Sequence, residues 1–205
     1  MRLRQHTNPL TYRGCYQGPA PAQLLGGAPT ELEIGPGYGE LLVARGREAP
    51  AVRLLGVEVR RAYVELCQQA LATAGVRNAC AIYAEARTDV PRLIEDASLD
   101  RIYLMFPDPW FKRRHHKRRV LDQKFAELLV AKLRPGGELH YATDNAELGA
   151  ELRAILDGIS AWQRVGDLPP AVAQSGRGQH HLGRGDPISG GRYARRTLLS
   201  STDRA

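Results

Sequence analysis

The chain has 205 residues, of which 43% are apolar and 25% are charged. This composition is typical of a globular protein with one hydrophobic core, and it excludes disordered and fibrous classes. The three cysteines (Cys15, Cys67 and Cys80) have no CxxC spacing, which excludes a disulfide scaffold and a cysteine zinc site and favours a reducing compartment. Because no apolar run reaches the length of a membrane span and residues 1–14 lack the apolar region of a secretory signal, we expect a cytoplasmic protein with no membrane partner.

Positive charge is concentrated in one segment. The formal net charge is +7, and residues 112–119 hold six Lys or Arg side chains and no acid. The rest of the chain is therefore nearly neutral, which indicates a polyanionic partner that docks at one place. The alternative is an ordinary solvated surface run, and only the position of the run distinguishes the two.

Strand and helix patterns alternate along the chain. Residues 1–29 contain four prolines and predict an irregular arm. Apolar runs predict strands at 31–34, 54–59, 80–83, 101–106 and 139–143. Helical spacing predicts helices at 40–47 and 60–74, a short helix at 90–94, and helices at 125–133 and 148–159. The pattern decays after Gly166, and the remaining residues predict loops with at most one weak strand pair.

This alternation predicts an α/β fold. Right-handed strand–helix–strand units give a mostly parallel central sheet with helices on both faces. We expect three regions: an irregular arm at 1–29, the α/β domain at 30–165, and a C-terminal extension at 166–205 that completes the substrate site. In such sheets, ligands bind beyond the carboxyl ends of the strands. Polar segments fall there after Ile34, at Glu58, after Phe106 and at Asp144.

The first of these segments is a glycine loop, in which Gly35, Gly37 and Gly39 follow Glu33. The G-x-G-x-G spacing differs from the G-x-G-x-x-G of dinucleotide-binding proteins. Glu33 would repel a pyrophosphate and attract a cationic cofactor, so S-adenosylmethionine fits this loop better than NAD, and an NAD-dependent dehydrogenase is disfavoured. An ordinary glycine turn is the alternative reading.

Two further acids follow the second and third predicted strands. Glu58 lies 19 residues after Gly39, close to the interval at which an acid binds ribose hydroxyls in nucleotide-binding folds. Glu85 is placed to accept a hydrogen bond from an adenine amino group. Alternatively, both are ordinary carboxylates at strand ends.

The most specific segment runs from Phe106 to Arg119. Two prolines hold Asp108 in an extended conformation, and Trp110 offers a flat face on which a base could stack. The basic run follows directly and suits phosphates. A rigid turn around a buried tryptophan is the alternative, but it leaves the adjoining polycation unexplained.

These motifs resemble the bacterial tRNA (guanine-N7)-methyltransferase family. The matching segments are Arg4-Gln-His-Thr-Asn-Pro-Leu10, Leu32-Glu-Ile-Gly-Pro-Gly-Tyr-Gly39, Leu55-Gly-Val-Glu-Val59, Phe106-Pro-Asp-Pro-Trp110 with His115-His-Lys-Arg-Arg119, and Leu133-Arg-Pro-Gly-Gly137 with Ala142-Thr-Asp144. The resemblance implies a Rossmann-like methyltransferase fold with S-adenosylmethionine as methyl donor and no metal. It also implies tRNA as the acceptor, methylated at N7 of a guanine in the variable loop.

The resemblance assigns roles residue by residue. Cofactor contacts are implied for Glu33, Gly35, Gly37, Gly39, Glu58, Glu85 and Asp108. Asp108 also matches the position proposed as catalytic, while Lys112 and Asp144 match substrate-contacting positions. We expect the remaining RNA contacts from Trp110, Arg113, Arg114, Lys117, Arg118 and Arg119.

One departure from the family pattern leaves an alternative open. The family usually has Thr-x-x-Glu near its C-terminal end, where this chain has Val172-Ala-Gln-Ser175, and we expect Gln174 or Asp167 as possible substitutes. The departure motivates a second reading, a catalytically degenerate tRNA-binding protein. A methyltransferase for a small molecule or a protein is a third reading. Both a monomer and a homodimer are compatible with the sequence.

Overall fold

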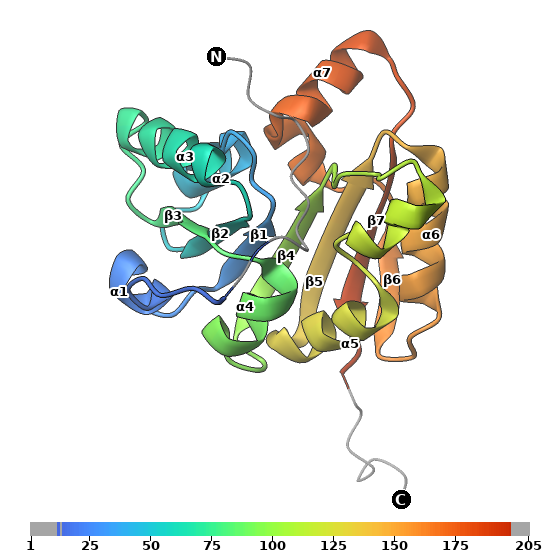
Figure 1. The fold of residues 1–205 in the computed structure, drawn as a ribbon, viewed down its shortest axis with the longest axis horizontal. Coiled ribbons are helices and arrows are strands. Elements are labelled where there is room, and N and C mark those ends of the chain that lie inside the picture. Colours follow the sequence, from blue (N-terminus) through green and yellow to red (C-terminus); the bar gives the residue numbers. More distant parts are fainter. Residues whose placement is uncertain (1–11, 13, 198–205) are drawn as a thin grey trace, which may run out of the picture.

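The computed structural model describes residue 12 and residues 14–197, so the predicted motif at 4–10 lies outside the described residues. Seven strands form one sheet in the order β3-β2-β1-β4-β5-β7-β6 (Figure 1). The first five are parallel neighbours, and β7 pairs antiparallel with both β5 and β6. The strands are β1 (Glu31–Ile34), β2 (Leu54–Glu58), β3 (Ala79–Tyr83), β4 (Leu99–Met105), β5 (Leu133–Thr143), β6 (Trp162–Gly166) and β7 (Ser189–Arg195).

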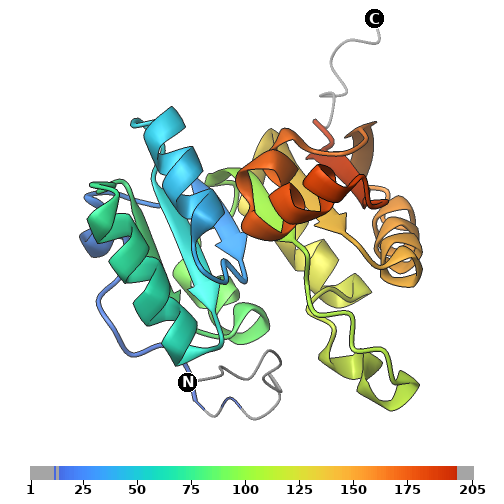
Figure 2. The same ribbon diagram turned by 90° about the horizontal axis from the view of Figure 1, so that it is seen from above.

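Helices cover both faces of the sheet (Figure 2), which confirms the predicted α/β class. One core packs α1, α4, α5 and α6 against the sheet, and a second core packs α2, α3 and η3 against the opposite face. The helices are α1 (Pro21–Leu25), α2 (Glu40–Glu48), α3 (Arg61–Thr73), α4 (Ala86–Leu93), α5 (Gln123–Lys132), α6 (Ala146–Asp157) and α7 (Gly176–Arg184), with 3-10 turns η2 (Arg113–Arg118) and η3 (Pro170–Gln174). No helix of the described residues is long and apolar enough to cross a bilayer.

The predicted strands β1 to β4 agree with the structure to within two residues, but β5 begins earlier than its apolar run suggests. Leu133, expected as the last turn of a helix, pairs with Leu99 of β4 instead. The register then shifts, and Arg101 pairs with Glu138. A Cβ atom on Gly137 would lie 2.9 Å from the Leu99 carbonyl oxygen, so this glycine lets the two strands approach closely.

The C-terminal segment is more regular than predicted, since it forms η3, α7 and β7. Gly190 and Gly191 of β7 interrupt the apolar alternation that would have revealed the strand. A Cβ atom on Gly191 would lie 2.8 Å from a ring carbon of Tyr141, so glycine is needed where β7 pairs with β5. The N-terminal arm also contains a short helix, α1, which begins at Pro21.

The parallel strands end at one edge of the sheet, and α7 lies beyond the ends of β4 and β5 at this edge (Figure 1). His181 of α7 stacks on Phe106, the residue after β4, with the ring centroids 5.9 Å apart. The fold thus brings the glycine loop, the acids at the strand ends and the C-terminal helix together.

Candidate active site

Two adjoining cavities lie at the carboxyl edge of the sheet. The first, of about 380 Å³, is lined by residues that include Gly35, Glu58, Arg60, Glu85, Asp108, Trp110, Lys117 and Arg118. The second, of about 940 Å³, is lined by residues that include Glu33, Gly35, Gly37, Tyr38, Arg60, Asp108, Phe111, Asp144, Arg177 and His181. Gly35, Arg60 and Asp108 line both cavities, so the two form one continuous candidate site.

The glycine loop turns in a conformation that side chains rarely adopt. Gly35, Gly37 and Gly39 have φ angles of +74°, +57° and +85°. At Gly39, a Cβ atom would also lie 3.1 Å from Cys67 Sγ. The loop can therefore wrap closely between β1 and α2, and it leaves its backbone open toward both cavities.

Glu33 is a buried carboxylate at the end of β1, with only 3% of its surface exposed. Its Oε2 atom has no hydrogen-bond partner among the described residues. Burial raises the pKa of Glu33 to about 8, with further contributions from the charges of Glu40 and Glu58. An orphaned acid of this kind fits a ligand that brings positive charge into the second cavity.

Glu58, at the end of β2, is already hydrogen-bonded. It accepts hydrogen bonds from the Gly37 backbone N–H at 3.3 Å and from the Arg60 guanidinium at 2.9 Å. The same guanidinium lies over the ring of Tyr63, 3.9 Å from its centroid. Arg60 thus covers the carboxylate that the sequence assigns to ribose hydroxyls, and a ligand there must share Glu58 with it or displace it.

Glu85 has a structural role that its sequence position does not reveal. Its side chain accepts a hydrogen bond from the Thr88 backbone N–H at 2.8 Å and so caps the first turn of α4. Glu85 also lines the first cavity beside Ala84 and Ala86. The carboxylate is therefore held in a fixed orientation at the wall of this cavity.

Asp108 lies on a strained loop between the two cavities. Phe106 and Trp110, two residues before and two after it, have φ angles of +49° and +46°, which are unusual for residues with side chains. Asp108 is half-buried, lines both cavities and interacts electrostatically with Arg60. The loop thus presents this carboxylate at the junction of the two cavities.

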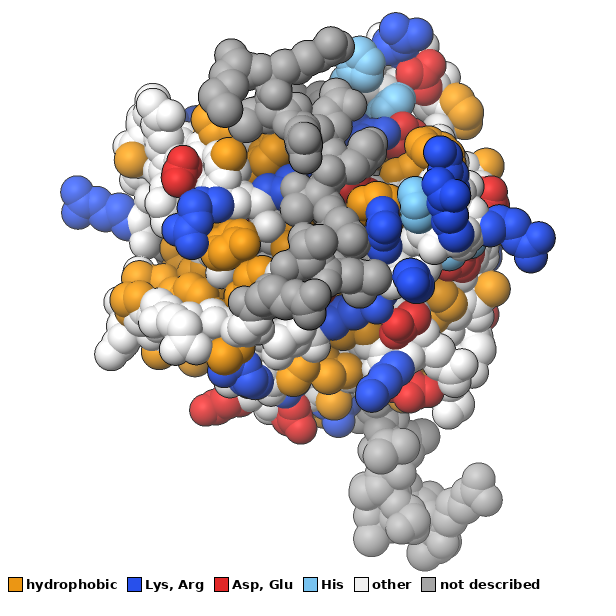
Figure 3. All heavy atoms as spheres, viewed as in Figure 1, with side chains coloured by type: hydrophobic (Ala, Val, Ile, Leu, Met, Phe, Trp, Pro, Cys, Tyr) orange, Lys and Arg blue, Asp and Glu red, His pale blue; other side chains and the backbone are white. Residues whose placement is uncertain are grey.

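Two residues of the basic run line the first cavity. Lys117 and Arg118 line the first cavity together with Gly35 and Glu58. Lys112, Arg113 and Arg114 are exposed, and basic side chains gather over η2 on the molecular surface (Figure 3). The run and the glycine loop therefore face one region of the molecule.

Arg119 differs from the other members of the run because only 3% of its side chain is exposed. It donates a hydrogen bond to the Pro109 carbonyl oxygen at 2.8 Å and forms ion pairs with Glu147 and Glu151 of α6. This arginine, which we expected to contact RNA, instead fastens the loop after β4 to α6, and its guanidinium is occupied by protein partners.

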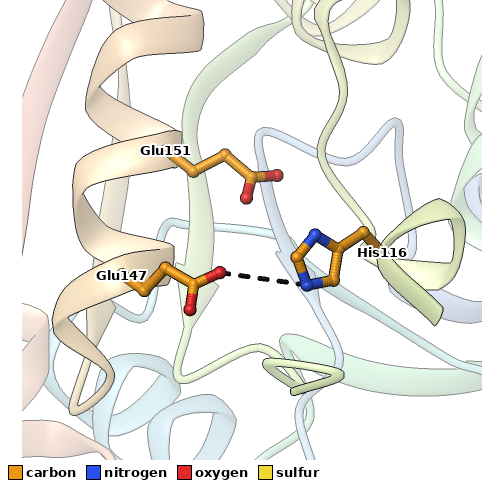
Figure 4. Close-up of side chains that lie close together, drawn as sticks. All are labelled: His116, Glu147 and Glu151. Atoms are coloured by element: carbon orange, nitrogen blue, oxygen red, sulfur yellow. Dashed lines mark ion pairs between the residues drawn. The ribbon is translucent and has the colours of Figure 1, made fainter. Parts of the chain in front are cut away.

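His116 lies beside the same two glutamates (Figure 4). One ligand atom from each of His116, Glu147 and Glu151 falls within 4.8 Å of the others, a spacing that a metal ion could accept. However, the guanidinium of Arg119 pairs with both carboxylates and supplies the positive charge there. We interpret this group as an ion-pair cluster between the basic loop and α6.

Asp144, after β5, joins the site to α7. It accepts a hydrogen bond from Arg177 at 2.7 Å and lies 3.2 Å from His181 Nε2. Burial is the largest single influence on the pKa of Asp144 and acts to raise it, but the hydrogen bond and the charge of Arg177, together with smaller contributions, outweigh burial, and the pKa lies below its ordinary value. The other ring nitrogen of His181 lies 3.0 Å from Asp186. Both partners of Asp144, Arg177 and His181, line the second cavity.

Sequence reasoning missed Arg60, Arg177 and His181. Arg60 could have been noticed two residues after Glu58, whereas no local signal ties the two α7 residues to Asp144. The two suggested substitutes for the missing Thr-x-x-Glu lie elsewhere: Gln174 donates a hydrogen bond to Glu48, and Asp167 pairs with Arg164. Neither is among the residues that line the two cavities.

Comparison with known proteins agrees with this geometry. Residues 27–170 match the family model described as "Putative methyltransferase". A tRNA (guanine-N(7)-)-methyltransferase of Myxococcus xanthus is 39% identical over 165 residues, which are 78% of this chain and 80% of that protein. The protein of that name from Shewanella oneidensis is 38% identical over 167 residues, covering 77% of this chain and 70% of the relative.

Solved structures agree at the level of the fold. A SAM dependent methyltransferase from Aquifex aeolicus has a TM-score of 0.57 at 17% identity and covers 86% of this chain and 89% of its own. An aminoglycoside resistance methyltransferase has a TM-score of 0.56 at 14% identity, with 80% and 86% covered. The sheet and its helices are thus those of a Rossmann-like methyltransferase. With the family model and the curated relatives, this shows that the chain belongs to the tRNA (guanine-N(7)-)-methyltransferase family.

Proposed function

We propose that this protein transfers a methyl group from S-adenosylmethionine to N7 of a guanine in the variable loop of tRNA. One observation carries the proposal: the basic run lines the same cavity as the glycine loop and Glu58, with Asp108 between the two cavities. A polyanion that docks on the run therefore reaches the place where a cofactor of this fold class binds. The names of the curated relatives support the same reading. The working compartment is then the cytoplasm, where tRNA and reduced cysteines occur together.

The residues present fit S-adenosylmethionine. The orphaned carboxylate of Glu33 suits an ammonium group, and the left-handed glycines leave room for close approach to the loop backbone. Glu58 would hold the ribose hydroxyls after Arg60 yields one of its hydrogen bonds, and Glu85 would face the adenine from the wall of the first cavity. The cofactor, when bound, supplies an electrophilic methyl group on a positively charged sulfur.

The reaction needs positioning more than acid–base chemistry. Guanine N7 has an available lone pair, so no general base is required to create the nucleophile. Holding the base in line can lower the barrier by about 7–11 kcal/mol in favourable cases. Methylation leaves positive charge on the base, and the carboxylate of Asp108 would favour that charge while accepting hydrogen bonds from N1–H and N2–H.

The remaining groups would hold the tRNA. The exposed side chains of Lys112, Arg113, Arg114 and Lys117 suit backbone phosphates, and the base must leave its stack to reach the second cavity. The C-terminal extension completes this cavity, because Arg177 and His181 line it together with residues of the glycine loop. In this proposal Asp144 acts with its two α7 partners.

The test is mass spectrometry of nucleosides from unmodified tRNA after incubation with the protein and S-adenosylmethionine. We expect 7-methylguanosine at one variable-loop position. Binding of tRNA without methylation would favour the degenerate binding protein instead. Methylation of small molecules or proteins, with no competition by tRNA, would contradict the assignment of the substrate.

A further inference from the structure

Trp110 and Phe111 are adjacent in the chain, yet they line different cavities. Trp110 lines the first cavity and Phe111 the second. The φ angle of +46° at Trp110 turns the backbone between them. A left-handed conformation is unfavourable at a residue with a side chain, so the surrounding structure must hold this turn in place.

The two aromatic side chains differ in what surrounds them. Arg118 lies over the indole of Trp110, 5.0 Å from the ring centroid, and His115 meets it edge-on at 6.0 Å. Phe111, by contrast, has 72% of its surface exposed, the largest fraction among the exposed large apolar residues in the described part of the chain. Trp110, the stacking residue predicted from the sequence, is thus already packed against one arginine and one histidine.

Phe111 lies between the basic run and the residues of the second cavity. The exposed side chain of Lys112 follows it directly and begins the basic run. Phe111 lines the second cavity together with Asp108 and with Tyr38, which is 51% exposed. Tyr38 packs edge-on against Tyr63 with centroids 5.0 Å apart, whereas no ring contact of Phe111 with another described residue is present. The ring of Phe111 is therefore accessible at a cavity that carboxylates also line.

We propose that Phe111 is a positioning residue that stacks on the guanine when the base enters the second cavity. This inference rests on the proposed function. An aromatic side chain offers a π-face that stacks on a nucleobase, and the carboxylates can then read the base edge that carries N–H donors. A base stacked on the ring also removes its exposed apolar surface from water, which favours binding.

Four variants test the proposal: Phe111→Ala, Phe111→Leu, Phe111→Trp and, as a matched control, Leu182→Ala. Leu182 is an exposed apolar residue of α7, at 46% exposure, outside both cavities. Stacking predicts that Phe111→Ala and Phe111→Leu raise KM for tRNA roughly tenfold or more, while Phe111→Trp stays near the wild type. If Phe111 contacts only the base, the dissociation constant of S-adenosylmethionine should change in none of them, although Phe111 and Glu33 line the same cavity.

A binding measurement gives a readout that a merely structural role would not move. In a tRNA with 2-aminopurine at the target position, stacking on Phe111 should quench fluorescence more in the wild type than in Phe111→Leu. Equal KM values for wild type and Phe111→Leu, with equal fluorescence, would overturn the stacking role while leaving the methyl transfer intact. A wild-type protein that methylates no tRNA would overturn the proposed function and this inference with it.

Discussion

Asp144 and Arg177 lie 33 residues apart in the sequence, and their side chains meet in an ion pair of 2.7 Å. The contact ties the end of β5 to the first turns of α7. Because both side chains line the second cavity, the pair helps to set the wall that α7 forms. A change here should therefore affect catalysis more than global stability.

Loss of this pair is the first prediction. In Arg177→Ala we expect kcat/KM for tRNA to fall roughly tenfold, while the melting temperature changes by no more than about 2 °C, since a half-exposed ion pair contributes little to stability. Steady-state kinetics and calorimetry measure the two effects. Arg184→Ala is the control, because it breaks an exposed pair between the last residue of α7 and Asp186, which follows the helix. An equal loss of kcat/KM in both variants would show that the overall positive charge of α7, and not the pair with Asp144, supports catalysis.

Cofactor binding is expected to release a proton from the carboxyl group of Glu33. Its pKa of about 8 means that the empty site holds a protonated carboxyl at pH 6.5. A ligand ammonium, with an ordinary pKa of about 7.7–8.0, is charged there and favours the ionised carboxylate, so binding should release close to one proton. Affinity should then rise with pH, by up to about tenfold per unit below pH 7.5.

Titration calorimetry in buffers of different ionisation enthalpy measures that proton. Glu33→Gln should bind the cofactor more weakly and release none. If the wild-type heat of binding is the same in every buffer, no proton is released, and Glu33 is not the group that meets the ammonium.

The basic run predicts the salt dependence of tRNA binding. Neutralising Lys112 and Arg113 together, each to Gln, should weaken binding and reduce the magnitude of the slope of log affinity against log salt by roughly 1.4–1.8. Arg77→Gln with Lys124→Gln removes the same charge from exposed positions outside the run. Filter binding over a range of salt concentrations compares the two. An equal change of slope in both pairs would mean that net charge, and not the run, binds the RNA.

Substitution of Arg119, unlike substitution of the exposed residues of the run, is expected to lower the stability of the fold. Arg119→Ala removes the partner of Glu147 and Glu151 and the donor to the Pro109 carbonyl. We expect about 2–3 kcal/mol of lost stability, less than for a fully buried pair because both acids reach solvent. The melting temperature should drop by roughly 5–10 °C. Arg114→Ala, at an exposed position, should leave it unchanged; a similar drop there would contradict the distinction.

Much of the fold and the outline of the site could be predicted from the sequence. The glycine loop, Glu58 and Asp108 lie at the ends of strands whose positions the sequence predicts to within two residues, so their place at one edge of the sheet follows from the predicted parallel arrangement. Helix α7 and strand β7 could not be predicted, because glycines occupy positions of close approach where a periodic pattern would otherwise appear.

Burial and backbone turns explain the rest of the difference. Composition marks Arg119 as one more cation of the run, and only the position of α6 shows that it is buried. Likewise, the sequence favours Trp110 as the stacking residue, and only the structure shows that Trp110 has a left-handed φ angle and that Phe111, not Trp110, lines the second cavity. Such features depend on contacts between distant segments.

The central claim is that the carboxylate of Asp108 serves methyl transfer to a guanine of tRNA. Single-turnover measurement of 7-methylguanosine formation, at saturating cofactor and tRNA, tests it most directly. We expect Asp108→Asn to lower the rate about 100-fold or more with the fold intact, while Asp167→Asn, a carboxylate remote from both cavities, stays at the wild-type rate. An Asp108→Asn protein that forms 7-methylguanosine at the wild-type rate would contradict the account.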